Sequence, residues 1–126
     1  TNEICKKIRS TYRAKIIPYN PNPLETLHQV SKCDLFIGMR YHSCLFAYLT
    51  EKPFLIIDYF TKCRSLANYI GLPDESVLSI SQILKGEFNE RLNHFDRNSS
   101  IFIAKMPVSE AIKKAENGLV DALSDF

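Results

Sequence analysis

The sequence has little net charge and lacks any long hydrophobic run, and both features narrow the class of protein. Its 16 lysines and arginines nearly balance 14 aspartates and glutamates, and the basic residues are scattered rather than clustered. This balance gives no electrostatic reason to expect a nucleic-acid partner. No apolar stretch approaches the roughly 18 residues of a membrane span, and the N-terminus lacks the apolar core of a signal peptide. We therefore expect a soluble, cytoplasmic protein without a membrane span.

The spacing of the cysteines also does not match a zinc site or a disulfide framework. The four cysteines are widely spaced, form no Cys-x-x-Cys motif, and three of them lie in apolar segments. This arrangement is typical of reduced thiols in a cytosolic protein. We therefore expect no bound metal. The four cysteines are Cys5, Cys33, Cys44 and Cys63.

Familiar cofactor and nucleophile motifs are absent as well. Gly38 is isolated, so the chain has no Gly-rich dinucleotide or phosphate loop of the usual kinds. Ser43 lacks the Gly-x-Ser-x-Gly elbow of a serine hydrolase, and no Ser, His and Asp/Glu set has the order of a hydrolase triad. The sequence therefore predicts neither a serine nucleophile nor a cofactor.

What the chain does contain is a regular alternation of strand-like and helix-like segments. Its 126 residues suit one domain, and a hydrophobic content of 45% is enough for a core. The alternation predicts an α/β domain with a parallel sheet of about four strands and helices between them. Strands are expected at 14–19, 34–39, 53–58 and 77–80, and helices at 2–12, 23–32, 43–51, 61–70 and from 81 onward.

The C-terminal third is less regular. Residues 85–100 are polar with weak periodicity, which predicts a surface helix that runs into a loop. Residues 108–126 have strong helical spacing of apolar side chains, so this helix must bury a stripe against this domain or against another one. The chain opens with Thr1 rather than Met, inside a predicted helix. We therefore expect it to be part of a larger protein.

The most informative segment is a strand that stops at Gly38 and leads into a helix. Residues 35–37 are continuously apolar, as in a strand covered on both faces, and Arg40 and His42 follow just before the helix. In an open parallel sheet, ligands bind at the C-terminal ends of the strands, and a helix N-terminus there favours an anion. Arg40 offers a charged planar fork, and His42 can transfer a proton near neutral pH. An anionic ligand is therefore expected.

A second cation follows the next strand. Lys62 comes after residues 53–58, and the C-terminal ends of parallel strands share one edge of a sheet, so Lys62 and Arg40 would face one crevice. Backbone N–H groups near Ser43 would add donors, and His42 would be the candidate acid. This combination suits a small, multiply anionic substrate. In a purely structural interpretation, Arg40 pairs with Asp34 or Asp58, His42 caps its helix and Lys62 is solvated.

These residues also carry a resemblance to a known family. Residues 14–73 resemble the C-terminal half of polysaccharide pyruvyl transferases. The shared pattern is an Asp-led strand, Gly-x-Arg-x-His-Ser at 38–43, a Phe-Ala helix, a Pro-led strand that ends near Tyr and Lys, and a Gly-Leu helix stop at 71–72. Residues 74–126 match only in general helical character.

The resemblance implies a Rossmann-like three-layer domain, placed as the C-terminal domain of a two-domain, GT-B-like protein. It implies transfer of a pyruvyl group from phosphoenolpyruvate to a sugar of a glycan, with a pyruvate ketal as product. Arg40 and His42 match the family's phosphoenolpyruvate-contacting Arg and His, and Lys62 matches its Lys. His42 is then catalytic, and Arg40, His42, Ser43 and Lys62 bind substrate. Without the N-terminal domain, which would carry acceptor contacts, this part alone is expected to be inactive.

Two other functions remain open. A GT-B glycosyltransferase would hold a nucleotide-sugar diphosphate in the same crevice, and a nucleoside diphosphate rather than phosphoenolpyruvate would then stabilise the protein. A non-catalytic interaction domain would bind no small anion and would dock through the helix predicted at 108–126. Both predict ligand behaviour that differs from that of a pyruvyl transferase.

Overall fold

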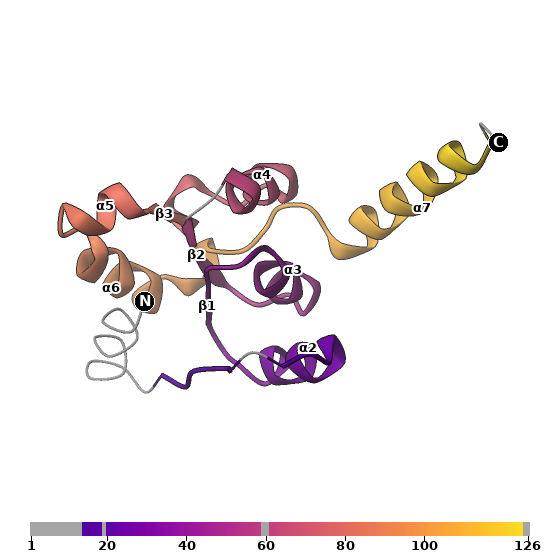
Figure 1. Ribbon diagram of the computed structural model, residues 1–126. Helices are drawn as coiled ribbons and strands as arrows, with labels where there is room; N and C mark the ends of the chain where they lie inside the picture. The colour runs from indigo at the N-terminus through magenta and orange to yellow at the C-terminus, as the bar shows by residue number, and fades with distance from the viewer. Residues whose placement is uncertain (1–13, 19, 59–60, 125–126) are drawn as a thin grey trace.

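The structure is a computed structural model that describes residues 14–18, 20–58 and 61–124, with side-chain environments up to Gly118. Its centre is a parallel sheet of three strands: β1 (Phe36–Gly38), β2 (Phe54–Asp58) and β3 (Val77–Ser79). The strands lie in the order β1-β2-β3, so β2 is central (Figure 1). The predicted helix at 2–12 lies outside the described residues.

Helices connect the strands and cover both faces of the sheet. The α3 and α4 helices connect β1 to β2 and β2 to β3 and pack on one face, whereas α5 and α6 lie on the other (Figure 1). The described helices are α2 (Pro23–Ser31), α3 (Tyr41–Leu49), α4 (Thr61–Ile70), α5 (Ile80–Leu84), α6 (Phe88–Arg97) and α7 (Val108–Ser124), with short 3-10 turns at Asp74–Ser76 and Ser99–Ile101.

The central strand shows why the domain has three layers. Phe54 and Ile56 point into the core that β2 shares with α3 and α4, and Leu55 and Ile57 point into the core that it shares with α6. All four are at most 1% exposed. A strand that is apolar on both faces must be covered on both faces. The α/β class and the Rossmann-like three-layer arrangement predicted from the sequence are therefore confirmed.

Several helix boundaries follow from local chemistry. The side chain of Asn22 accepts a hydrogen bond from the Leu24 N–H at 3.1 Å, and Pro23 occupies the first helical position of α2. The α4 helix ends before Gly71, whose φ of +74° is a left-handed conformation that glycine adopts without strain. Both boundaries match the prediction from sequence.

The predicted strand at 14–19 is wrong for the residues that the structure describes. Residues 14–18 have no strand structure, and Lys15 and Ile16 are exposed. Only Ile17 of this hydrophobic run is packed against the core. A strand exists only when its backbone pairs with a neighbour, and β1 is the edge of the described three-stranded sheet.

The predicted surface helix within residues 85–100 is present as α6, but one face of it is buried. The α6 helix buries Phe88, Leu92 and Phe95 against β2 and β3, and its other residues are polar. These three residues are spaced i, i+4, i+7 and therefore lie on one face of the helix. The many polar residues between them made this buried face hard to recognise in the sequence. A short 3-10 turn follows at Ser99–Ile101, and Phe102 is fully buried beyond it.

The α7 helix confirms the predicted C-terminal helix but extends away from the sheet (Figure 1). Its first turn is anchored, because Val108 and Ala111 pack against the core that contains α3 and α4. Farther along, Ile112 is 48% exposed. Within the described residues, the apolar stripe is therefore only partly buried by this domain.

Candidate anion-binding site

The start of α3 forms the centre of the candidate site. Arg40 is the N-cap residue, with extended backbone (φ −107°, ψ 147°), and no side chain caps the helix. Its carbonyl accepts hydrogen bonds from the Cys44 N–H at 3.1 Å and from the Ser43 hydroxyl at 2.8 Å. The Ser43 hydroxyl is thus used inside the helix turn. The N–H groups of the first turn have no side-chain cap and can donate to an anion.

The side chains of Arg40 and His42 are exposed beside this helix end. The His42 ring contacts the Tyr41 ring edge-on, with 5.6 Å between ring centroids. Within the part of the chain that the structure describes, neither Arg40 nor His42 makes an ion pair or a side-chain hydrogen bond. Both polar groups are therefore available to a ligand.

Lys62 lies at the same edge of the sheet. It is the second residue of α4, it is exposed, and among the described residues it makes no ion pair. The C-terminal ends of β1 and β2 meet at this edge because the two strands are parallel neighbours. The Cys63 thiol lies 3.7 Å from the Met39 carbonyl, which directly joins the first turn of α4 to the end of β1. The structure therefore brings Arg40, His42, Ser43 and Lys62 to one edge.

Gly38 allows α3 to approach β1 closely. A Cβ atom at this position would lie 2.8 Å from a ring carbon of Phe36 and 2.9 Å from Cys44 Sγ. The described glycines with positive φ are Gly71 and Gly86, so Gly38 is not required for its backbone conformation. Lack of space next to the helix explains the glycine.

Two buried thiols lie beneath the two helix ends. Cys44 is 0% exposed and Cys63 is 3% exposed, and each thiol is within hydrogen-bonding reach of the other. Burial raises the pKa of Cys44 strongly, and the neighbouring Cys63 raises this pKa further. Burial also raises the pKa of Cys63, and the nearby charge of Asp58 adds to this effect. Both thiols stay protonated near neutral pH, so neither provides a thiolate nucleophile.

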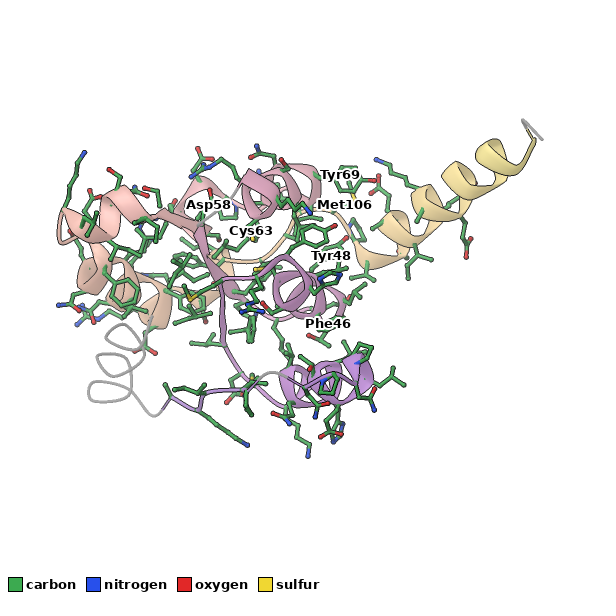
Figure 2. All side chains as sticks on the ribbon, viewed as in Figure 1. Phe46, Tyr48, Asp58, Cys63, Tyr69 and Met106 are labelled. Carbon is green, nitrogen blue, oxygen red and sulfur yellow. The ribbon has the colours of Figure 1, made fainter. Side chains whose placement is uncertain are left out.

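Asp58, at the end of β2, has a different partner from the one considered in the sequence. Its Oδ2 atom lies 3.4 Å from Nε of Arg64 on α4, and among the described residues it forms no ion pair with Arg40. Asp58 and Cys63 lie near each other at this edge (Figure 2). Arg64 was not among the residues predicted from the sequence, although its position two residues after Lys62, in the first turn of α4, was an available signal.

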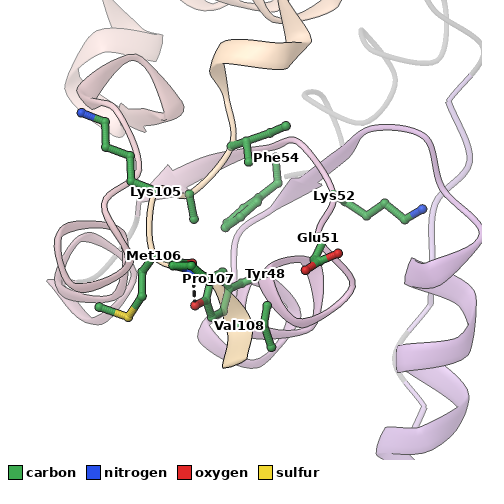
Figure 3. A pocket seen from close by; sticks show the side chains of 10 residues that line it. Tyr48, Glu51, Lys52, Phe54, Lys105, Met106, Pro107 and Val108 are labelled. Carbon is green, nitrogen blue, oxygen red and sulfur yellow. Dashed lines mark hydrogen bonds between the residues drawn. The ribbon is translucent and has the colours of Figure 1, made fainter. Parts of the chain in front are cut away.

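Two other hollows occur away from this edge. One, of about 380 Å³, lies between the C-terminal end of α3 and the segment before α7, where the Tyr48 hydroxyl donates to the Met106 carbonyl at 2.9 Å (Figure 3). The other, of about 410 Å³, is lined by Glu87, Glu90, Arg91 and His94 on and before α6. Neither includes a predicted site residue. The first is lined by Tyr48, Glu51, Lys52, Phe54, Ile103, Ala104, Lys105, Met106, Pro107 and Val108.

The described residues contain neither a cluster of metal ligands nor a helix that could span a membrane. No group of three or more His, Cys, Asp or Glu side chains is placed to hold a metal ion in this part of the chain. Among the described helices, none has the length and apolar character needed to cross a bilayer.

A protein family model matches the first part of the chain. Residues 1–59 match the model of a family described as polysaccharide pyruvyl transferase. Residues 1–59 are thus similar to the polysaccharide pyruvyl transferase family. The match confirms the resemblance found in the sequence and includes β1, Arg40, His42 and Ser43, but it ends before Lys62. At the level of the family, it supports a transferase that acts on a polysaccharide. No curated protein and no solved structure matches the chain.

Proposed function

We propose that this chain binds phosphoenolpyruvate and takes part in the transfer of its pyruvyl group to a sugar. The observation that carries the proposal is the uncapped N-terminus of α3, with Arg40 and His42 exposed beside it, inside the segment that matches the family. Phosphoenolpyruvate has a carboxylate, a phosphate and a methylene carbon, and the site offers a suitable group for each.

The two anionic groups of the donor call for different partners. The Arg40 guanidinium can form two parallel hydrogen bonds with a carboxylate, which an ammonium group cannot reproduce. The phosphate suits the N–H groups at the start of α3 together with the ammonium group of Lys62. In this arrangement, the donor lies across the ends of β1 and β2.

His42 supplies the proton that the reaction requires. A sugar hydroxyl oxygen bonds to the central carbon of phosphoenolpyruvate and loses its proton to solvent, while the methylene carbon accepts a proton from His42 and becomes a methyl group. A second hydroxyl of the same sugar then displaces the phosphate from that carbon. Its proton leaves with the phosphate, and the ketal is complete. The exposed ring of His42 lies next to the proposed donor position.

We also propose that the 126 residues act as the donor-binding domain of a larger, two-domain, GT-B-like protein. Contacts to the acceptor sugar would come mainly from the other domain. The family match to a polysaccharide-modifying transferase supports an acceptor of this class. The donor site and the acceptor site can then be tested separately in the full-length protein.

Calorimetry of phosphoenolpyruvate binding, combined with a transfer assay, tests the proposal. Arg40→Lys keeps the charge but loses the fork, and a charge-assisted hydrogen bond is worth about 1.5 to 3 kcal/mol. Its affinity should therefore fall about tenfold or more. His42→Gln cannot donate a proton, so binding should be nearly normal while turnover falls by about 10² to 10⁴.

Arg97→Lys is the matched control, because Arg97 is an exposed arginine on α6, which covers the other face of the sheet. It should bind and turn over like the wild type. Binding that is indifferent to Arg40→Lys, or wild-type turnover in His42→Gln, would contradict these roles. Stabilisation by a nucleoside diphosphate alone would favour a glycosyltransferase, and no binding of small anions would favour an interaction domain.

A further inference from the structure

Arg64 is a cation at the edge of the sheet that the family pattern and the sequence motifs leave without a role. It lies in the first turn of α4, two residues after Lys62, yet its guanidinium reaches back to the end of β2. There its Nε atom is 3.4 Å from Oδ2 of Asp58, the last residue of that strand. The guanidinium is therefore placed beside the end of β2 by this contact.

Asp58 explains why Arg64 takes this position. The Asp58 side chain is only 12% exposed, and its Oδ1 atom is buried without a hydrogen-bond partner in the described residues. A buried carboxylate is costly unless a cation or donor compensates it. Within the described ranges, Arg64 is the one cationic side chain that forms an ion pair with Asp58.

Arg64 still has donors to offer. Its side chain is 45% exposed, and its contact with Asp58 is made through Nε. No described residue hydrogen-bonds to its two terminal nitrogens, which carry four of the five N–H groups of a guanidinium. One edge of the guanidinium is thus oriented by the protein, and the other remains open for an oxyanion.

We propose that Arg64 is a further substrate-binding residue, which binds the phosphate group of the donor together with Lys62 and is oriented by Asp58. The proposal deepens the function proposed above and rests on it. It also accounts for a carboxylate at the rim of an anion site. Asp58 alone would repel phosphate, whereas the pair with Arg64 offsets this charge and presents a guanidinium fork instead.

The negative charge of phosphoenolpyruvate favours a third cation at this edge of the sheet. A phosphate ester carries about 1.5 to 2 negative charges at neutral pH, and the carboxylate of phosphoenolpyruvate adds one more. Arg40 and Lys62 alone provide two positive charges, and Asp58 at the same edge subtracts one. Arg64 offsets the charge of Asp58 and so restores the two positive charges of the edge, and its rigid fork suits a tetrahedral phosphate better than a flexible ammonium group does.

The test measures binding of phosphoenolpyruvate and of inorganic phosphate to the full-length protein by calorimetry. Arg64→Lys keeps the charge that offsets Asp58 but loses the fork, so its melting temperature should be near that of the wild type. We expect its affinity for both ligands to fall about threefold to tenfold. The affinity of Arg64→Gln should fall at least tenfold, because glutamine removes the positive charge and the fork and leaves Asp58 uncompensated.

The double variant Asp58→Asn/Arg64→Gln separates binding from folding. Removal of the Asp58 charge should restore part of the affinity lost in Arg64→Gln, because the repulsion has gone. Arg97→Gln makes the same charge change on the opposite face and should bind like the wild type. A purely structural role predicts lower melting temperatures but unchanged affinity in the folded variants, and that result would overturn the proposal.

Measurements with both phosphoenolpyruvate and inorganic phosphate can show whether the role of Arg64 or the proposed donor is incorrect. Wild-type affinity for both ligands in Arg64→Lys and Arg64→Gln, alongside weakened phosphoenolpyruvate binding in Arg40→Lys, would overturn only the role of Arg64. Binding of phosphate that depends on Arg64, without binding of phosphoenolpyruvate, would support Arg64 and overturn the proposed donor. A wild-type protein that binds neither ligand would overturn both.

Discussion

At the scale of single residues, Gly38 controls how closely α3 approaches β1, and this spacing can be tested directly. In Gly38→Ala the new methyl group would meet Phe36 and Cys44 at less than 3 Å. Crowding of this kind in a packed core costs about 1 to 3 kcal/mol. We therefore expect the free energy of unfolding in urea to fall by that amount, and the bulkier Gly38→Val to lose more.

Gly118→Ala is a suitable control for this prediction. Gly118 is an exposed residue within α7, and a Cβ atom there would meet nothing within 4 Å. The change to alanine should stabilise the helix by up to about 1 kcal/mol. Equal effects of the two substitutions would show that space at Gly38 is not limiting.

Residue types and positions explain why Arg40, His42 and Lys62 could be proposed from the sequence. Each follows a predicted strand, and parallel strands bring such positions to one edge of a sheet. The partner of Asp58 could not be chosen in the same way. Arg40 and Arg64 carry the same charge and both lie next to the end of a strand, so the pairing with Arg64 depends on side-chain geometry in the folded state.

At the scale of secondary structure elements, α6 has a larger structural role than its composition indicates. Leu92 is 4% exposed in the core beneath β2 and β3. Leu92→Ala removes buried methyl groups and leaves a cavity, which typically costs about 2 to 5 kcal/mol. Urea denaturation monitored by circular dichroism should show a loss of this size without a large change in m-value.

The control lies one turn away on the same helix. Asn89 is exposed, so Asn89→Ala should change the free energy of unfolding by less than about 0.5 kcal/mol. If Leu92→Ala lowered the free energy of unfolding as little as Asn89→Ala, α6 would not form part of the core.

Local chemistry determined the elements that sequence analysis placed well. Caps and stops such as Asn22 and Gly71 act within a few residues, so their effect is visible in the sequence. The predicted strand at 14–19 failed over its described residues because strand formation depends on a distant partner. The apolar stripe of α6 has a helical period, but it consists of only three residues among polar ones, so the sequence signal for a buried face was weak.

At the scale of the whole molecule, burial is concentrated around β2 and decreases along α7. Residues 54–57 are at most 1% exposed, whereas Ile112 on α7 is 48% exposed. Amide hydrogen exchange should follow this gradient, because protected amides open only when the core does. We expect the slowest exchange in β2 and fast exchange at 112–118 when the protein is studied by mass spectrometry.

The full-length protein provides an internal comparison for this measurement. If another part of it covers α7, exchange at 112–118 should be slow there and fast in the isolated 126 residues. Slow exchange in the isolated residues would show instead that this domain alone buries the helix. Fast exchange in β2 would contradict the central position of that strand.

The alternation of strands and helices can be derived from the sequence alone, as can the presence of Arg40 and His42 between a buried strand and a helix. Both depend on periodicity and on residues a few positions apart, which act before distant segments meet. Three other features are visible only in the folded protein: α3 lacks a side-chain cap, α6 contributes to a second core, and Asp58 pairs with Arg64. These features depend on which segments pack together, because burial and side-chain geometry arise from contacts between residues far apart in the chain.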